Sequence, residues 1–445
     1  MWSKKESITP PQWMLIGFAI IILIGAILLS TTWATSSGNT IDFIDALFTA
    51  TSAVCVTGLT VLDTGHDFSW FGQMIILLLI QVGGLGFMTF SVMFAIALGK
   101  KIGFHQRILI QESTRAESYG GLVRLVKWIF YVTLAFEAIA AVILTLRWSA
   151  ELGLFKAAYY ALFHAISAFN NAGFSLWSNN LMDYVNDPVV NLVITSLFII
   201  GGIGFIVLLD IFYKDRWQRY SLHSKITLVG TLLLMILGTL VVYLFEFHNP
   251  KTLGALTWDG KLWGAYFQGV VTRTAGFNTI DISSMLAPTQ LTMVFLMFIG
   301  ASSGSTGGGI KVSTFFILLF TVLSVARGES EVHVFQRRIA HDLILRAVAV
   351  IIISTTVVLG ISLLLTITEH ALQRDFLEIL FEVTSAFGTV GLTMGLTPDL
   401  SSMGKGLIIV CMYIGRLGPL TLAYALALKR SKAKIRYAEE KILIG

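Results

Sequence analysis

One short, glycine-containing stretch occurs four times in this chain. The copies are AVCVTGLT at 53–60, AFNNAGFS at 168–175, VTRTAGFN at 271–278 and AFGTVGLT at 386–393. Their glycines lie 115, 103 and 115 residues apart, and ten residues before each glycine is an aromatic residue in an apolar, helix-compatible segment. The aromatic and glycine pairs are Phe48 and Gly58, Phe163 and Gly173, Tyr266 and Gly276, and Phe381 and Gly391. A repeat with this period indicates four copies of one structural unit.

The composition places these units in a membrane. Hydrophobic residues make up 55% of the 445 residues and charged residues 13%, with a mean hydropathy of +0.79. Soluble globular proteins are much more polar, so the sequence predicts a polytopic membrane protein. Cys55 and Cys411 form neither a disulfide framework nor a metal-binding spacing, and Cys55 is interpreted as a small neutral filler. The first apolar run has no cleavage site of small residues, which favours a retained helix over a signal peptide.

The apolar runs predict eight membrane crossings. A helix needs about 20 apolar residues to span a bilayer. Runs of that length lie at about 12–33, 72–98, 122–146, 189–213, 224–246, 290–325, 343–367 and 405–428. Shorter amphipathic runs lead into the glycine stretches at 41–54, 155–169, 261–272 and 375–387. The shorter runs cannot span, and we interpret them as re-entrant half-helices.

The predicted fold is an all-α polytopic membrane protein built from four parallel units. Each unit consists of a helix, a half-helix, a glycine strand and a second helix. Because each unit crosses the membrane twice, all four have the same orientation and can surround one axis with pseudo-fourfold symmetry. The predicted segments are a terminus at 1–11, units at 12–103, 104–217, 218–327 and 328–428, and a tail at 429–445.

Basic residues predict the orientation of these units. The segments outside the units, together with both ends of the chain, hold 22 of the 31 Lys and Arg residues. They are predicted to be cytoplasmic by the positive-inside rule, in a multi-pass protein of the cell membrane. The glycine loops then open to the outside. This topology explains the net charge of +5 without nucleic acid, although the tail KRSKAKIRYAEEK could contact anionic lipid.

The glycine strands have the properties expected of a cation filter. Irregular backbone at membrane depth is tolerated where it lines a cavity or is buried in protein. Half-helices that end there direct partial negative charge at the centre, and strand carbonyls can replace the hydration shell of a cation. Glycine permits the positive φ that such a strand needs. The candidate cation-binding residues are Val56, Thr57, Gly58, Asn171, Ala172, Gly173, Thr274, Ala275, Gly276, Thr389, Val390 and Gly391.

The same positions favour a monovalent ion. No acidic residue occurs at either position before the four glycines, whereas divalent selectivity would call for a ring of Asp or Glu. Four tight turns between helices are the alternative, but turns need not recur at a fixed distance from an aromatic residue. No metal ion other than the cation at the filter is expected.

The chain resembles the potassium-translocating subunits of the Trk/Ktr/HKT superfamily, and within it the KtrB type of bacterial Ktr systems. The four filter stretches carry the resemblance, together with IQVGGLGF at 80–87, IIGGIGFI at 199–206, GASSGSTGGGIK at 300–311 and IGRLGPLT at 414–421. It covers the chain from about residue 12 onward. It implies a potassium-channel-like pore and potassium uptake, with each glycine matching the first glycine of the potassium-channel TVGYG strand. A serine in the first strand is associated with sodium-preferring plant relatives.

The resemblance also implies an intramembrane gate below the filter. The helix after the third filter is interrupted by GASSGSTGGGIK, whose glycines weaken a helix by about 1 kcal/mol each. A packing kink is the alternative, and a phosphate-binding loop is disfavoured because Lys311 lacks the G-K-[ST] arrangement. Arg416 either guards the inner cavity or caps carbonyls of this loop. The candidate gate residues are Gly300, Ala301, Ser302, Ser303, Gly304, Ser305, Thr306, Gly307, Gly308, Gly309, Lys311 and Arg416.

By the same resemblance, the chain is expected to form a homodimer on a cytosolic ring of RCK-type subunits. ATP and ADP would bind that ring, because this chain has no dinucleotide-binding fingerprint and no cofactor of its own is expected. Potassium is the transported ion, and sodium could act as an activator. The basic segments 100–127 and 326–346 are the expected docking surface.

Three further residues stand out. Arg273 precedes the third glycine by three positions and could hold filter carbonyls or pair with an acid such as Glu382. Glu137 lies mid-helix, where an ionisable group suggests proton coupling or a buried hydrogen bond to a neighbouring helix. His164 is expected to pack or hydrogen-bond within its half-helix.

Two other classes of function remain open. A sodium- or proton-coupled secondary cation transporter would use inverted repeats with carboxylates in the membrane, whereas these repeats are parallel and Glu137 is alone. A membrane enzyme would need a nucleophile or a metal cluster, and no Ser/His/Asp arrangement, CxxC or HExxH motif is visible. The sequence therefore predicts a protein that is not an enzyme.

Overall fold

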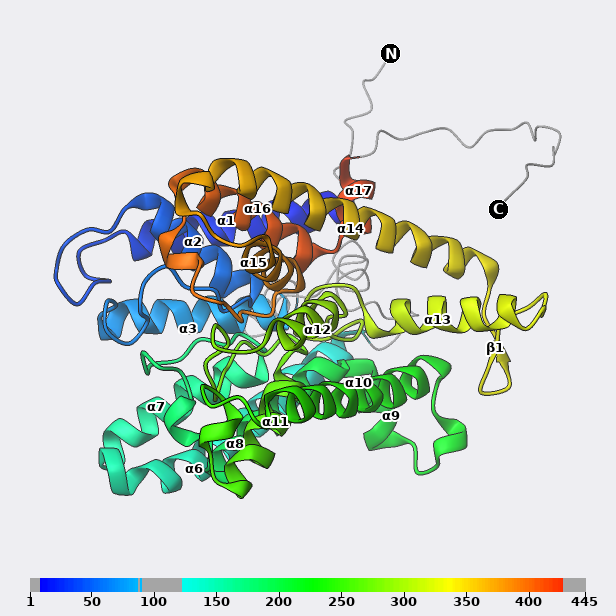
Figure 1. The fold of residues 1–445 in the computed structure, drawn as a ribbon, viewed down its shortest axis with the longest axis horizontal. Coiled ribbons are helices and arrows are strands. Elements are labelled where there is room, and N and C mark those ends of the chain that lie inside the picture. The colour runs from blue at the N-terminus through cyan, green and yellow to red at the C-terminus, as the bar shows by residue number, and fades with distance from the viewer. Residues whose placement is uncertain (1–8, 87–88, 90–121, 427–445) are drawn as a thin grey trace, which may run out of the picture.

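The computed structural model of the chain describes residues 9–86, 89 and 122–426, which are mostly helical (Figure 1). The helices of the first two units are α1 (Pro10–Leu29), α2 (Phe43–Cys55), α3 (Trp70–Leu85), α6 (Leu122–Leu152), α7 (Leu154–Phe169), α8 (Pro188–Ile203) and α9 (Phe205–Tyr213). Those of the last two are α10 (Leu222–Glu246), α11 (Trp258–Val271), α12 (Ala287–Phe298), α13 (Val312–Ala326), α14 (His341–Thr368), α15 (Phe376–Gly388), α16 (Ser402–Leu417) and α17 (Pro419–Leu426). Five short 3₁₀ turns lie at Met182–Tyr184, Trp217–Arg219, Leu253–Ala255, His370–Leu372 and Thr397–Asp399.

Four helices end at the repeated glycine stretches. These are α2, α7, α11 and α15, and their bounds confirm the predicted short helices to within three residues. Their C-terminal halves are buried and rich in small residues, as in ATSAVC at the end of α2. Small side chains let the backbones of neighbouring helices approach closely, which brings the helix ends together.

The first helix of each predicted unit is long enough to cross a membrane, but the second is interrupted in the second, third and fourth units. The structure contains four helices of sufficient length and apolarity, α1, α6, α10 and α14, or five if α8 and α9 count as one bent span. The helix α8 ends at Gly204 (φ +97°), where the chain bends by 98° into α9. Gly86 (φ +80°) follows α3, and Gly418 (φ +86°) separates α16 from α17. Continuous helices over 189–213 and 405–428 are therefore wrong, because a left-handed residue cannot continue a right-handed helix. The interruption predicted at GASSGSTGGGIK is confirmed, since α12 ends at Phe298 and α13 begins at Val312.

The half-helices link the four units into a closed ring. Within the units, α2 packs on α1 and α3, α7 on α6 and α8, α11 on α10, and α15 on α14 and α16. Between the units, α3 contacts α7, α8 contacts α11, α12 contacts α15, and α16 contacts α2. Each second helix thus lies against the half-helix of the next unit. The boundary predicted at 103/104 lies outside the described residues.

A two-stranded hairpin departs from the all-α prediction. Strands β1 (His333–Val334) and β2 (Arg337–Arg338) pair antiparallel, with His333 opposite Arg338. The two turn residues, Phe335 and Gln336, have φ of +49° and +61°, which matches the left-handed turns favoured in two-residue hairpins. Together with α13 and the start of α14, the hairpin projects from the body of the molecule (Figure 1). It presents Arg337 and Arg338 as exposed residues.

Buried acids join the first and second helices within a unit, at the face where the half-helices begin. Glu246 at the end of α10 is fully buried and accepts four hydrogen bonds. The donors are Asn249 Nδ2 (2.7 Å), Thr252 Oγ1 (2.6 Å), the Leu286 backbone N–H (2.9 Å) and Thr289 Oγ1 (2.5 Å). In the fourth unit Glu369 accepts from Ser401, the residue that caps α16. Each acid fixes the start of a second helix against the end of a first helix.

We expect Glu246→Ala to lower the free energy of unfolding by about 3 kcal/mol, because several buried donors lose their acceptor at once. The matched control is Glu329→Ala, since Glu329 is exposed at the end of α13. Apparent melting temperatures in detergent, followed by size-exclusion chromatography, measure the difference. Equal melting temperatures for the two variants would contradict the structural role of Glu246.

Candidate functional site

The four glycine stretches meet at one place. A side chain added at Gly58 would contact the backbone of Ala172 and Gly173, and one added at Gly173 would contact Ala275 and Gly276. A Cβ added at Gly276 would lie 2.7 Å from the Val390 carbonyl oxygen, and one added at Gly391 would contact the backbone of Thr57 and Gly58. The contacts therefore run around a closed ring of four strands. Any side chain at these positions would collide with the backbone of the next strand.

The four strands share an unusual backbone. The residue two before each glycine is left-handed, with φ of +58° at Val56, +60° at Asn171, +66° at Thr274 and +50° at Thr389. Three of these are β-branched residues, for which this region is strained and signals a functional constraint. The glycines have φ between +69° and +91°, whereas the residues between have negative φ. This alternation turns successive carbonyls of a strand to the same side, which an ordinary extended strand does not do.

Serines behind the strands support three of them. Six positions before the glycine, Ser52 and Ser385 accept hydrogen bonds from the backbone N–H of Gly58 and Gly391, each at 3.1 Å. Ser167 donates to the carbonyl of Phe174 at 2.8 Å. The third strand has Val270 at this position. Sequence reasoning missed these serines, although their fixed distance from the glycines was a usable signal.

Glycines of the second helices pack on the ends of the half-helices. A Cβ at Gly83, Gly201 or Gly415 would overlap the carbonyl group of Val54, Phe169 or Phe387, four residues before the glycine of each strand. These glycines precede the helix-breaking glycines by three positions. The motifs after the first, second and fourth glycine strands thus provide both a close packing point and a helix end.

The predicted gate segment, which we call the 300–311 loop, lies directly against the glycine strands. Thr306 Oγ1 donates to Asn171 Oδ1 at 2.9 Å, and Asn171 Nδ2 donates to Thr274 Oγ1 at 3.2 Å. The Gly308 N–H donates to Thr389 Oγ1 at 3.0 Å. The loop is therefore bonded directly to Asn171 and Thr389, and Asn171 links it to Thr274.

Hydrogen bonds also tie the 300–311 loop to the surrounding helices. The loop N–H groups of Ser302 and Thr306 donate to the carbonyls of Gly202 and Gly201 in α8. The hydroxyl of Ser302 is 3.3 Å from that of Thr227, and Ser305 Oγ donates to the Ser302 carbonyl. Gly300 and Ala301 pack against Gly308, and the Gly309 N–H donates to the Gly415 carbonyl. Ser303 and Gly304 lie against Gly204.

Two cationic side chains bind carbonyls of this loop. Lys311 Nζ donates to Gly307 O at 2.8 Å and to Gly308 O at 3.3 Å. Arg416 donates to the carbonyls of Thr306, Gly83 and Gly84, the last at 3.2 Å. The prediction that Arg416 caps carbonyls of the loop is confirmed. It also joins the loop to α3, a contact that no sequence pattern indicated.

The other ionisable residues have separate partners. Glu382 accepts hydrogen bonds from the hydroxyls of Thr393 (2.8 Å) and Thr397, and no ion pair within the described part of the chain joins it to Arg273. Of the two roles considered for Arg273, the pair with Glu382 is therefore wrong, because local hydroxyls already satisfy the acid. His164 lies between Tyr160 O (2.7 Å) and Ser175 Oγ (3.1 Å), as expected. Cys55 is fully buried.

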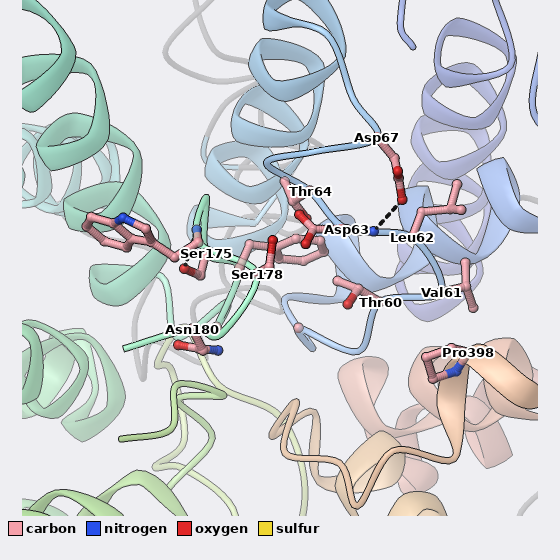
Figure 2. A pocket seen from close by; sticks show the side chains of 14 residues that line it. Thr60, Val61, Leu62, Asp63, Thr64, Asp67, Ser175, Ser178, Asn180 and Pro398 are labelled. Atoms are coloured by element: carbon pink, nitrogen blue, oxygen red, sulfur yellow. Dashed lines mark hydrogen bonds between the residues drawn. The ribbon is translucent and has the colours of Figure 1, made fainter. Parts of the chain in front are cut away.

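A polar cavity of about 350 Å³ opens beside the first two glycine strands (Figure 2). Gly58 and Gly173 are among its lining residues, and its polar lining includes Thr60, Asp63, Thr64, Asp67, Ser175, Ser178 and Asn180. In the segment after the first glycine strand, the Asp63 N–H donates to Asp67 Oδ2 at 2.8 Å. Asp67 also pairs with the exposed His66 and raises its pKa above the usual value, because the charged imidazole gains that hydrogen bond.

Long apolar helices around a ring of glycine backbone define a membrane protein of the ion-transport class. Residues 9–436 match the family model described as TrkH, cation transport protein, and the chain belongs to this family. It is 51% identical to the Ktr system potassium uptake protein B of Bacillus subtilis, over 99% of this chain and 98% of that protein. It is 40% identical to the potassium/sodium uptake protein NtpJ of Enterococcus hirae, with the same two coverages.

The fold is also that of a solved relative. The crystal structure of the potassium transporter TrkH from Vibrio parahaemolyticus matches with a TM-score of 0.71 at 22% identity, over 96% of this chain and 87% of that one. These matches confirm the resemblance to the Trk/Ktr/HKT superfamily and its KtrB type. The relatives are named as transport proteins, in agreement with the prediction that this chain is not an enzyme.

We expect Gly415→Ala to lower the free energy of unfolding by about 1–3 kcal/mol and to reduce rubidium uptake, because its methyl group would lie 2.8 Å from the Phe387 carbonyl carbon. Gly406→Ala is the matched control, since it lies on the same helix with nothing within 4 Å of the added atom. Alanine there should be neutral or slightly stabilising. If both variants behave alike, the close packing at Gly415 is not required.

Proposed function

We propose that the chain takes up potassium across the cell membrane through a single pore formed within one chain. The observation that supports this best is the closed ring of four strands, each with a left-handed residue two positions before a left-handed glycine. Carbonyls turned to one side of four such strands can replace the water around a cation. The names of the relatives, potassium uptake protein B and potassium/sodium uptake protein NtpJ, support potassium as the ion.

The filter in this proposal consists of three residues from each strand. They are Val56, Thr57, Gly58, Asn171, Ala172, Gly173, Thr274, Ala275, Gly276, Thr389, Val390 and Gly391. None is acidic, which favours coordination of a monovalent ion by backbone carbonyls. The ends of α2, α7, α11 and α15 lie next to these strands, and their partial negative charge adds to the attraction.

The surrounding fold in this proposal has eight spans in four units with pseudo-fourfold symmetry. Each broken second helix counts as one span. Both chain ends and the segments between units are cytoplasmic, and the glycine loops face outward. The cavity in Figure 2 is then the outer mouth of the pore. Asp63 and Asp67 at this mouth would raise the local concentration of cations.

The 300–311 loop serves as the gate in this proposal. It lies against the inner end of the filter through Asn171 and Thr389, and two cationic side chains occupy its carbonyls. An ammonium or guanidinium group on these carbonyls competes with a permeating cation for the same oxygens. Opening requires the loop to leave these contacts, and release of Arg416 is the step that would allow it.

Regulation is proposed to come from outside this chain. The name of the B. subtilis relative places it in a Ktr system. A homodimer on a cytosolic RCK-type ring that binds ATP and ADP would be consistent with such a system. The projecting hairpin with Arg337 and Arg338 lies in the predicted docking segment 326–346. Most of the segment 100–127 lies outside the described residues. Sodium as an activator or second ion is consistent with the name of the E. hirae relative.

The filter is tested by substituting serine at Gly58, Gly173, Gly276 and Gly391 in turn. Each serine would collide with the neighbouring strand, so we expect a fall of about tenfold or more in the preference for potassium over sodium. Rubidium uptake in a potassium-uptake-deficient host, with sodium as competitor, measures this preference. If all four variants keep the wild-type affinity for rubidium and the wild-type preference over sodium, the filter proposal is wrong.

The gate is tested with Arg416→Ala, which should raise the initial rate of rubidium uptake because the 300–311 loop loses its link to α3 and α16. Arg416→Lys should lie between wild type and alanine, since lysine keeps the charge but not the fork of donors. Unchanged uptake rates in both variants, at equal protein levels, would remove Arg416 from the gate.

A further inference from the structure

Glu137 is a buried carboxyl group for which the proposed function has not yet provided a role. It lies in the middle of α6 and is 3% exposed. Both of its oxygens accept hydrogen bonds: Oε2 from Gln81 Nε2 at 3.2 Å, and Oε1 from Asn170 Nδ2 at 3.1 Å. A carboxyl group at membrane depth requires such partners, and these two belong to α3 and to the end of α7.

Gln81, Glu137 and Asn170 form a triangle of hydrogen bonds, and Asn170 connects this triangle to the proposed filter. Its Nδ2 also lies 2.8 Å from Gln81 Oε1 and 2.9 Å from the Ile166 carbonyl, so its two hydrogens are shared among three acceptors. Asn170 is fully buried and caps α7, and the next residue is the left-handed Asn171 of the second strand. The position of Asn170 therefore determines how the second strand leaves its half-helix.

The two adjacent asparagines point to opposite sides of the strand. Asn170 is held by Glu137 and Gln81 on the scaffold side, whereas Asn171 bonds to Thr274 of the third strand and to Thr306 of the 300–311 loop. Gln81 belongs to the first unit and Glu137 to the second. The triangle thus clamps the second strand between two units, with Gly84 leaving room for the Asn170 side chain.

The other strands lack an equivalent arrangement. Three positions before the glycine, they have Cys55, Arg273 and Gly388 in place of Asn170. Cys55 and Gly388 have no side-chain amide. Among the described residues no carboxyl group forms an ion pair with Arg273. Among the described residues, the second strand alone follows a residue, Asn170, whose side-chain amide is held by a buried acid.

We propose that Glu137 and Gln81 are positioning residues for ion selectivity, acting through Asn170 on the second filter strand. The inference rests on the proposed potassium filter and deepens it. Glu137 does not contact the ion; its hydrogen bonds hold the strand at the spacing that suits potassium. Outer-layer partners of ion ligands commonly change affinity by about 10–100-fold when removed, which sets the size of the expected effect.

The test uses the full-length chain in a potassium-uptake-deficient host, with sodium competing against rubidium uptake. Glu137→Ala and Asn170→Ala should each lower the preference for rubidium over sodium by about tenfold while uptake persists. Glu137→Gln keeps the shape and part of the hydrogen bonding, so it should restore part of the lost preference. The level of folded protein is measured by size-exclusion chromatography for every variant.

Glu246→Ala is the matched control, because Glu246 is an equally buried and hydrogen-bonded acid that does not contact a filter strand. It should reduce the amount of folded protein and leave the ion preference unchanged. A wild-type preference in both Glu137→Ala and Asn170→Ala, or a Glu246→Ala variant that shifts the preference equally, would overturn the inference. If the serine variants of the four glycines also keep wild-type selectivity, the filter proposal itself fails; if they lose it, the inference alone fails.

Discussion

The close approach of four backbones at Gly58, Gly173, Gly276 and Gly391 is the constraint on which the rest of the structure depends. No side chain fits between the strands, so their spacing is set by what lies behind them. Small residues at the ends of the half-helices, serines six positions before the glycines and glycines in the second helices all bring backbone against backbone. In a membrane, such packing contributes stability that hydrophobic burial cannot provide.

The broken second helices follow from the same packing. Gly83, Gly201 and Gly415 each touch the end of a half-helix, and three residues later a left-handed glycine ends the helix. In the third unit the short break is replaced by the 300–311 loop. Its backbone groups bond to α8, to the Thr389 side chain and to Arg416, so this irregular backbone does not remain unsatisfied.

The sequence predicted the repeat, the four half-helices and the membrane class because these depend on periodic patterns. It did not predict the end of α3 at Gly86 or the breaks at Gly204 and Gly418, since a glycine in an apolar run gives no sign of its φ angle. Partners of single buried side chains were equally inaccessible. Glu382 was one possible partner for Arg273, but its donors, Thr393 and Thr397, lie in its own unit. Long-range pairs such as Gln81 and Asn170 arise only when the units are assembled.

Arg416 stands where the first two units have Gly84 and Gly202, directly after a packing glycine. A pore assembled from four identical chains would have to repeat any such substitution four times, and four guanidinium groups would then crowd the axis. Joining the units in one polypeptide removes that requirement. Duplicated units can diverge separately, so a single positive charge can be introduced at one quarter of the circumference while the other three quarters keep their glycines or loop.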